Sequence, residues 1–199
     1  MSNRIIVKNV RGLYPFLTAP RKNDKGEPGK YSLQCMLKKG DPQIEVLKKA
    51  IMAAAKEKFG ENVNLKSLSL PLRDGDEQDA EHYHGHVYFN ANSTSAPQIV
   101  NRFNEKATEQ DLYEYCYSGA TYHISCAFYG YNKNGNKGVA CGLSNVMLRA
   151  KTEPIQSGAS AQSDFADLKD DADAEFGKDP YAPQNKQSDD VDFEEDFQF

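Results

Sequence analysis

The fold is decided by the stretch Thr121-Tyr-His-Ile-Ser-Cys-Ala-Phe-Tyr-Gly-Tyr-Asn-Lys-Asn-Gly-Asn-Lys-Gly-Val-Ala-Cys-Gly-Leu-Ser-Asn-Val-Met-Leu-Arg149. Two runs of strand-forming residues flank an Asn-Gly pair, and Asn-Gly between such runs is the strongest short-range signal of a β-hairpin. Because side chains alternate between the faces of a strand, one face carries Tyr122, Ile124, Cys126 and Phe128. The other face carries Tyr129 and Tyr131, near a tip with Lys133 and Lys137.

Shorter predicted elements precede this hairpin in the sequence. Residues 4–17 and 31–38 read as two strands, joined by a basic loop over residues 19–30, and Gly12 predicts a bulge or sharp bend in the first strand. Asp41-Pro42 is a typical helix start, and apolar residues with helical spacing continue to Phe59, so we expect a helix over about 41–59. Residues 86–91 and 98–101 read as further short strands, and Thr108 begins a short helical or turn segment.

The charge is divided unevenly along the chain. Residues 157–199 contain 13 acids and three lysines, a net charge of −10, whereas the whole chain carries −5, so residues 1–156 carry +5. Such a polar, self-repelling segment cannot bury enough apolar surface to offset chain entropy. We therefore predict one folded domain over residues 1–156 and a disordered acidic tail over residues 157–199.

The first residues contain no long apolar run and no cleavage site, so no signal peptide is expected, and no apolar stretch is long enough for a membrane span. The four cysteines form no C-x-x-C pair and lie in apolar or aromatic stretches, which is typical of buried reduced thiols in a cytosolic protein. We expect a cytoplasmic protein without membrane contact.

No catalytic motif is present: the chain has no G-x-x-x-x-G-K-[ST] loop, no H-E-x-x-H and no G-x-S-x-G. Residues 73–86 form an acidic loop leading into His82, His84 and His86, which could hold a metal if alternate side chains of an extended segment pointed to one side. Solvated acids and surface histidines are the simpler interpretation. We expect no metal, no cofactor and no catalytic residue.

A nucleic-acid-binding function fits the sequence better than a catalytic one. A mainly β body with several short strands, a helix after the second strand and basic loops is compatible with a five-stranded barrel of the OB kind. Such barrels bind single strands by contacting phosphates with lysine and arginine and by stacking bases on aromatic rings.

The chain also resembles a known family. The acidic tail ending in Phe199, the basic β-rich body and the stretch Tyr131 to Val146 are similar to acidic-tailed, OB-fold single-stranded DNA-binding proteins of T-odd coliphages and their relatives. The resemblance implies an OB barrel with an inserted helix and a role in phage DNA replication and recombination in the bacterial host cytoplasm. It also implies a tail that occupies the DNA groove and contacts replication proteins such as polymerase, helicase or primase. Dimerisation occurs in part of that family.

The candidate site residues are cations and aromatics near the predicted loops and strand ends. For phosphate contacts we select Lys8, Arg11, Arg21, Lys22, Lys30, Arg102, Lys133 and Lys137. For base stacking we select Tyr14, Phe16, Tyr31, Tyr88, Tyr129 and Tyr131. For partner binding by the tail we select Asp189, Asp190, Asp192, Phe193, Glu194, Glu195, Asp196, Phe197 and Phe199.

Three hypotheses follow. The first is a non-catalytic, sequence-independent single-strand binder, whose affinity for duplex DNA stays open. The second is a DNA-mimic or acidic interaction protein that acts through its tail. The third is a metal-dependent nuclease that uses the loop from Asp74 to His86.

Overall fold

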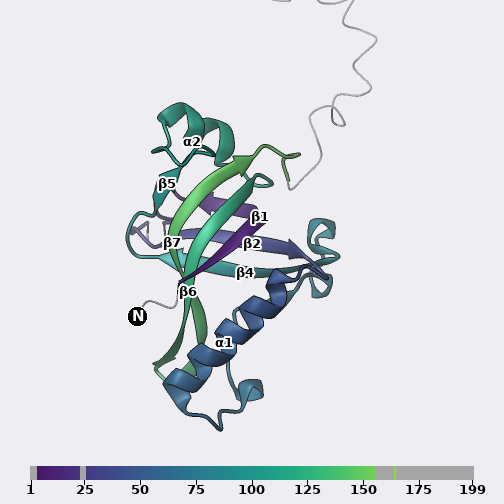
Figure 1. The fold of residues 1–199 in the computed structure, drawn as a ribbon, viewed down its shortest axis with the longest axis vertical. Helices are drawn as coiled ribbons and strands as arrows, with labels where there is room; N and C mark the ends of the chain where they lie inside the picture. The colour runs from purple at the N-terminus through teal and green to yellow at the C-terminus, as the bar shows by residue number, and fades with distance from the viewer. Residues whose placement is uncertain (1–3, 23–25, 156–163, 165–199) are drawn as a thin grey trace, which may run out of the picture. The chain divides into compact units, whose positions relative to one another are not determined.

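A computed structural model describes residues 4–22, 26–155 and 164. The predicted acidic tail, apart from Asp164, lies outside the described residues. The strands are β1 (Ile5–Phe16), β2 (Tyr31–Lys38), β3 (Arg73–Asp74), β4 (His86–Ser93), β5 (Gln98–Val100), β6 (Thr121–Lys133) and β7 (Asn136–Ala150). The helices are α1 (Gln43–Phe59) and α2 (Glu109–Tyr115), with short 3-10 turns η1 (Leu65–Ser67), η2 (Gly75–Glu77) and η3 (Glu81–Tyr83) (Figure 1).

Five strands close into a barrel. Antiparallel pairing joins β1 to β2 and to β6, β2 to β4, and β6 to β7, and a short parallel pairing of β4 with β7 closes the ring. The closing contacts are Ala91 with Cys141 and Asn92 with Gly142. Strands β3 and β5 extend the sheet at its two ends. The predicted OB-like barrel with an inserted helix is confirmed.

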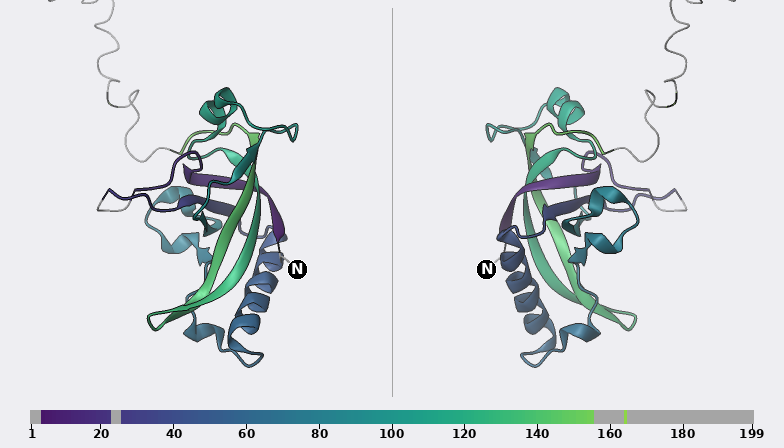
Figure 2. Two further views of the ribbon diagram at one scale, coloured as in Figure 1. Left: turned by 90° about the vertical axis from the view of Figure 1, so that its left-hand side faces the viewer. Right: turned by 90° about the vertical axis from the view of Figure 1, so that its right-hand side faces the viewer.

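The predicted hairpin is present as β6 and β7. Its turn residues Asn134 and Gly135 both have positive φ, 51° and 82°, as a two-residue type I′ turn requires. The tip of this hairpin projects past the barrel and lies beside α1 (Figure 2). Tyr131, Lys133 and Lys137 therefore stand on an arm rather than on the barrel wall.

Helix α1 begins within two residues of the predicted position and ends where predicted. A side-chain oxygen of Asp41 accepts a 2.9 Å hydrogen bond from the backbone N–H of Gln43 and so caps the first turn. Gly60, at φ 94°, follows the last helical residue. Ile44, Leu47, Ile51, Ala54 and Ala55 form its buried face.

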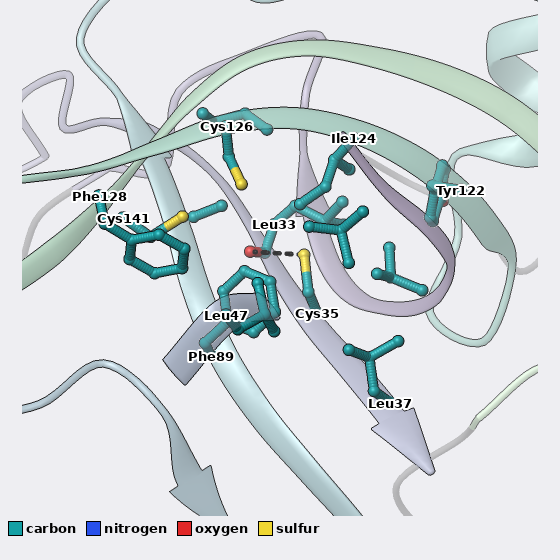
Figure 3. Packing of buried hydrophobic residues seen from close by; sticks show 14 of the residues in the cluster. Leu33, Cys35, Leu37, Leu47, Phe89, Tyr122, Ile124, Cys126, Phe128 and Cys141 are labelled. Atoms are coloured by element: carbon teal, nitrogen blue, oxygen red, sulfur yellow. Dashed lines mark hydrogen bonds between the residues drawn. The ribbon is translucent and has the colours of Figure 1, made fainter. Parts of the chain in front are cut away.

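The barrel interior is a single apolar cluster to which every barrel strand contributes (Figure 3). Three of the four free cysteines, Cys35, Cys126 and Cys141, are buried in it, and burial raises the pKa of the Cys35 thiol well above its usual value. These thiols are core side chains, as expected. The raised pKa keeps the Cys35 thiol out of thiolate chemistry.

Gly12 has a different role from the predicted one. It pairs in register with Cys35, and the irregularities of β1 lie on either side, between Val7 and Val10 and between Leu13 and Phe16. A Cβ atom at Gly12 would stand 2.4 Å from the ring of Tyr122. The glycine thus makes room for a buried tyrosine, and the bulges form elsewhere.

Helix α2 begins at a capping box. The Thr108 hydroxyl accepts from the backbone N–H of Asp111, whose carboxylate accepts in return from the N–H of Thr108. Among the described residues, no helix is both long enough and apolar enough to cross a membrane.

Candidate nucleic-acid interface

The outer face of β2 and β4 carries a row of polar side chains. Leu33 and Cys35 point into the core, so the residues between and beside them, Ser32 and Gln34, face outward. On β4 the same alternation turns Asn90 and Asn92 outward, and the register pairs them with Gln34 and Ser32 respectively. These four side chains form a flat hydrogen-bonding floor outside the barrel.

The basic loop between β1 and β2 folds back over the edge of this floor. The N–H of Arg21 donates to the carbonyl of Lys30 at 3.0 Å, and the N–H of Gly29 donates to the carbonyl of Arg21 at 2.7 Å. A Cβ at Gly29 would lie 2.4 Å from that same carbonyl oxygen, so glycine permits the close pairing. Backbone hydrogen bonds therefore hold Arg21 and Lys30 together at one place, although their exposed side chains are free to adapt.

Tyr14 enters the site from a bulge in β1. Its φ is +48°, a conformation that is uncommon for a bulky residue and is found where surrounding structure enforces it. The enforcing contact is a 3.0 Å hydrogen bond from its backbone N–H to the hydroxyl of Ser118. As a result the side chain of Tyr14 is 51% exposed, and that of Phe16, two residues later, is 36% exposed.

Together these features enclose a groove of about 630 Å³, which we call the β1–β2 groove. Its lining residues are Tyr14, Phe16, Arg21, Lys22, Gly29, Lys30, Ser32, Gln34, Asn90 and Asn92. The groove combines cations for phosphates, aromatic rings for stacking and amides for hydrogen bonds to bases or sugars. Five of the residues selected from the sequence meet here, and Tyr31 lies next to them at the start of β2.

Two further predicted cations lie on the other half of β1. Arg11 lines a second hollow of about 420 Å³, with Lys38 and His86. Its guanidinium donates to the carbonyl oxygens of Gly119 and Glu153, at 3.4 and 3.0 Å. Lys8 is exposed beside the start of α1. The structure does not bring these residues into the β1–β2 groove.

Arg102 lies near α2. Its guanidinium carbon stands 4.7 Å from the centre of the Phe103 ring, a cation–π arrangement. Tyr131, Lys133 and Lys137 stand on the β6–β7 arm, and the Tyr131 hydroxyl lies against Gly138 on the facing strand. Tyr129 lies on the barrel wall, with its ring against Gly142, which pairs with Asn92. These five residues are also outside the groove.

The prediction of Tyr88 as a stacking residue does not fit its place in the structure. Tyr88 does face outward from β4, but it is only 4% exposed because Tyr83 covers it, with ring centroids 5.0 Å apart. Leu13, Met36, Tyr83 and Tyr88 form a small apolar cluster outside the barrel, against which Ile155 packs. A ring closed in this way offers no face to a base.

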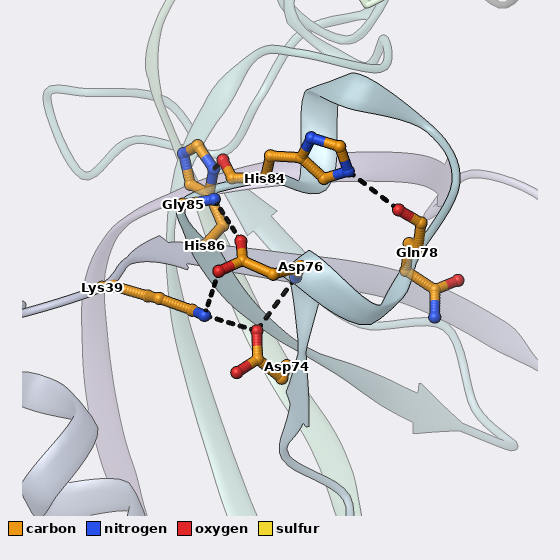
Figure 4. A network of polar contacts seen from close by, with 7 residues as sticks. All are labelled: Lys39, Asp74, Asp76, Gln78, His84, Gly85 and His86. Atoms are coloured by element: carbon orange, nitrogen blue, oxygen red, sulfur yellow. Dashed lines mark hydrogen bonds and ion pairs between the residues drawn. The ribbon is translucent and has the colours of Figure 1, made fainter.

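Residues 74–86 form a hydrogen-bonded segment with short turns (Figure 4). The histidine metal site considered from the sequence assumed an extended segment instead. Lys39 forms ion pairs with Asp74 at 2.6 Å and with Asp76 at 2.5 Å, and Asp76 also accepts from the N–H of Gly85 at 2.7 Å. The ammonium of Lys39 lowers the pKa of both carboxyl groups. Two of the four acids considered for a nuclease, Asp74 and Asp76 but not Glu77 and Asp79, thus already pair with a cation.

The histidines of this segment are separated by turns. His82 belongs to η3, Gly85 has φ 72°, and His84 and His86 each bond a backbone carbonyl, of Gln78 and of His84 respectively. Within residues 4–22 and 26–155, no group of three or more His, Cys, Asp or Glu side chains is placed to hold a metal ion.

Sequence reasoning missed the polar floor of the groove. Ser32 and Gln34 alternate with Leu33 and Cys35, and Asn90 and Asn92 flank Ala91, so the period-2 pattern marked them as outward-facing. What the pattern could not show is that β2 and β4 lie side by side in this register.

Two comparisons of sequence match most of the chain. A family model described as "Enterobacter phage Enc34, ssDNA-binding protein" matches residues 3–176. Protein p50 of Acyrthosiphon pisum secondary endosymbiont phage 1 is 31% identical over 177 residues, which cover 83% of this chain and 94% of p50.

Solved structures show the same fold. The single-stranded DNA-binding protein of bacteriophage Enc34, in complex with ssDNA, matches with a TM-score of 0.67 and 22% identity, over 77% of this chain and 89% of that one. The gp2.5 single-stranded DNA-binding protein of bacteriophage T7 matches with a TM-score of 0.54 and 17% identity, over 84% and 94%.

Proposed function

Because the chain belongs to the family of phage single-stranded DNA-binding proteins represented by that of Enterobacter phage Enc34, we propose that it binds single-stranded DNA in the β1–β2 groove. The observation that carries this assignment is the meeting of Tyr14 and Phe16 with Arg21, Lys22 and Lys30 around one groove. The aromatic residues come from the end of β1 and the cations from the loop that follows it, so a single hairpin supplies both kinds of contact.

The chemistry of the groove supports binding without sequence preference. Phosphate contacts carry no sequence information, and every base has a face that can stack on an aromatic ring. The groove is also open, since its floor is the outer face of a sheet rather than a closed pocket. A continuous strand can therefore enter at one side and leave at the other.

We propose that the protein acts by binding alone, without a catalytic step. Asp74 and Asp76, two of the acids in the loop that a metal-dependent nuclease would use, are both paired with Lys39. This pairing supports a structural role for the loop.

The acidic tail would compete with DNA for the same groove. Its net charge of −10 opposes the +5 of the body, so the two parts of the chain attract each other. The N–H of Ile155 donates to the carbonyl of Ser118 at 2.8 Å, and Ser118 is the residue whose hydroxyl holds Tyr14. An acidic segment tethered to this basic body would act as an internal polyanion.

The remaining roles are proposals from the family and the composition. The protein would protect unwound DNA during phage replication and recombination in the cytoplasm of the bacterial host, as one domain over residues 1–156 with its tail. The phenylalanines among the last residues of the tail, Phe193, Phe197 and Phe199, would anchor replication proteins, since docking peptides use aromatic anchors. Duplex binding and a homodimer are open extensions of this proposal.

Fluorescence anisotropy tests the proposal, with a labelled oligo-dT strand and a matched duplex, across a salt series. We expect the full-length protein to bind the single strand, and a protein ending at residue 156 to bind it more tightly. The gain should be largest at low salt, where the tail's charges are screened least. Absence of binding by both forms would contradict the proposal and favour a protein that acts through its tail.

A further inference from the structure

Tyr83 is a residue of the outer face that neither the sequence nor the groove lining identifies. It lies in η3, outside the barrel, and its ring packs on Leu13, Met36 and Tyr88. The side chain is only 8% exposed, so the ring itself is not available for stacking. The apolar contacts fix the ring in place and leave its hydroxyl as the group that can act on the groove.

That hydroxyl lies within hydrogen-bonding reach of Tyr14 and makes a short hydrogen bond to Gln34. It donates to the side-chain oxygen of Gln34 at 2.5 Å, and Gln34 is part of the groove floor. Because this bond uses the amide oxygen, the two N–H donors of the Gln34 amide are the groups that remain for a ligand. Burial, together with the neighbouring Tyr14, raises the pKa of Tyr83 to about 12, so the hydroxyl stays protonated and able to donate.

We propose that Tyr83 is a positioning residue of the β1–β2 groove, which holds the Gln34 amide with its N–H donors toward the bound strand. This inference rests on the proposed DNA-binding function. An amide that is free to flip would present a donor or an acceptor in turn, whereas a fixed donor is compatible with every base. Each base has at least one carbonyl oxygen or ring nitrogen that accepts a hydrogen bond. A fixed donor therefore suits binding without sequence preference.

The segment that carries Tyr83 is itself held to the barrel. Lys39, directly after β2, pairs with Asp74 and Asp76, and Asp76 bonds the N–H of Gly85 (Figure 4). These contacts bracket η3 on both sides. These contacts also give the acidic loop a role in the β1–β2 groove, because they fix the position of Tyr83 over the outer face of β2 and β4.

The test compares Tyr83→Phe with wild type in the full-length chain, by anisotropy with oligo-dT. Phenylalanine keeps the ring packing and removes only the hydroxyl. We expect affinity to fall about 2- to 10-fold, the range that one neutral hydrogen bond is worth. The slope of log affinity against log salt should stay the same, because no phosphate contact is lost. Tyr122→Phe is the matched control: its hydroxyl bonds the carbonyl of Tyr115 at 2.6 Å inside the barrel, so its loss should lower the melting temperature and leave affinity unchanged.

A double-mutant cycle separates positioning from stability. If Tyr83 acts through Gln34, then Tyr83→Phe should change affinity little in a Gln34→Ala background. An equal loss in both backgrounds, or no loss in wild type, would overturn the inference while wild-type binding still supports the proposed function. Failure of wild type itself to bind oligo-dT would instead contradict the proposed function.

Discussion

Tyr14 and Ser118 are joined across 104 residues of sequence by a 3.0 Å hydrogen bond from the backbone N–H of Tyr14 to the Ser118 hydroxyl. The bond stabilises a left-handed backbone at Tyr14, which turns the ring away from the barrel and into the groove. The carbonyl of the same serine accepts from the N–H of Ile155, the last residue described before the acidic tail. One residue of the loop before β6 thus contacts both the stacking residue and the C-terminal end of the folded domain.

The loop cations should dominate the salt dependence of binding. Replacing Arg21, Lys22 and Lys30 together by alanine should weaken oligo-dT binding and lower the salt slope by about 2, at about 0.7 per phosphate contact. Lys133→Ala/Lys137→Ala on the β6–β7 arm is the control, with a slope near that of wild type. A larger loss of affinity in the control variant would indicate that the DNA phosphates contact the arm and not the loop.

Tyr14 should contribute through stacking. Tyr14→Ala should lower affinity for oligo-dT by about 1–3 kcal/mol, the usual value for one stacked base, with an unchanged salt slope. Tyr113→Ala is the comparison, because Tyr113 is 87% exposed on α2 and does not line the groove. We expect Tyr113→Ala to bind as wild type does, and quenching of tyrosine fluorescence by DNA to be weaker only in the Tyr14 variant.

Gly12 should be intolerant of a side chain. Gly12→Ala places a Cβ 2.4 Å from the Tyr122 ring and 2.9 Å from Leu33, so overpacking should destabilise the fold by about 1–3 kcal/mol. In Gly142→Ala the nearest atom is 3.5 Å away, an ordinary contact, and the effect should be small. Urea unfolding of both variants measures the difference, and equal midpoints would show that β1 can shift to accept the methyl group.

The ion pairs and the hydrogen bond that hold the segment around η3 should weaken at low pH. The pKa of Asp76 is lowered, first by its hydrogen bond with Lys39, so its contribution is present above the pKa of an unfolded aspartate and is lost as pH falls through the lower folded value. The backbone N–H of Gly85 donates a hydrogen bond to the Asp76 carboxylate. Its hydrogen exchange should therefore become faster below about pH 4, relative to a reference amide in the barrel. Lys39→Met should give the same loss of protection at neutral pH, whereas Lys48→Met on α1 should not.

Local sequence signals predicted the elements whose determinants lie close together in the chain. Asn134-Gly135 marked the hairpin and Asp41-Pro42 the helix start, and both act through turns or caps of a few residues. The basic loop also lay beside Tyr14 and Phe16 because one hairpin carries all of them. That part of the groove could therefore be predicted without knowing which distant segments pack together.

The remaining features depend on contacts between distant segments. Tyr88 was selected as a stacking residue, yet Tyr83, in a separate segment, covers it. Arg11 looked like a free cation, but its guanidinium binds the carbonyl of Glu153, 142 residues away. The polar floor required the register of β2 against β4, which no local pattern specifies.

The most direct measurement is photocrosslinking of the full-length protein to an oligonucleotide that contains 5-iodo-deoxyuridine, followed by mass spectrometry of the crosslinked peptides. The account predicts crosslinks at Tyr14 and Phe16, and at Tyr31 next to the groove. Crosslinks confined to Tyr131 would place the strand on the β6–β7 arm and contradict the assignment of the β1–β2 groove as the DNA site.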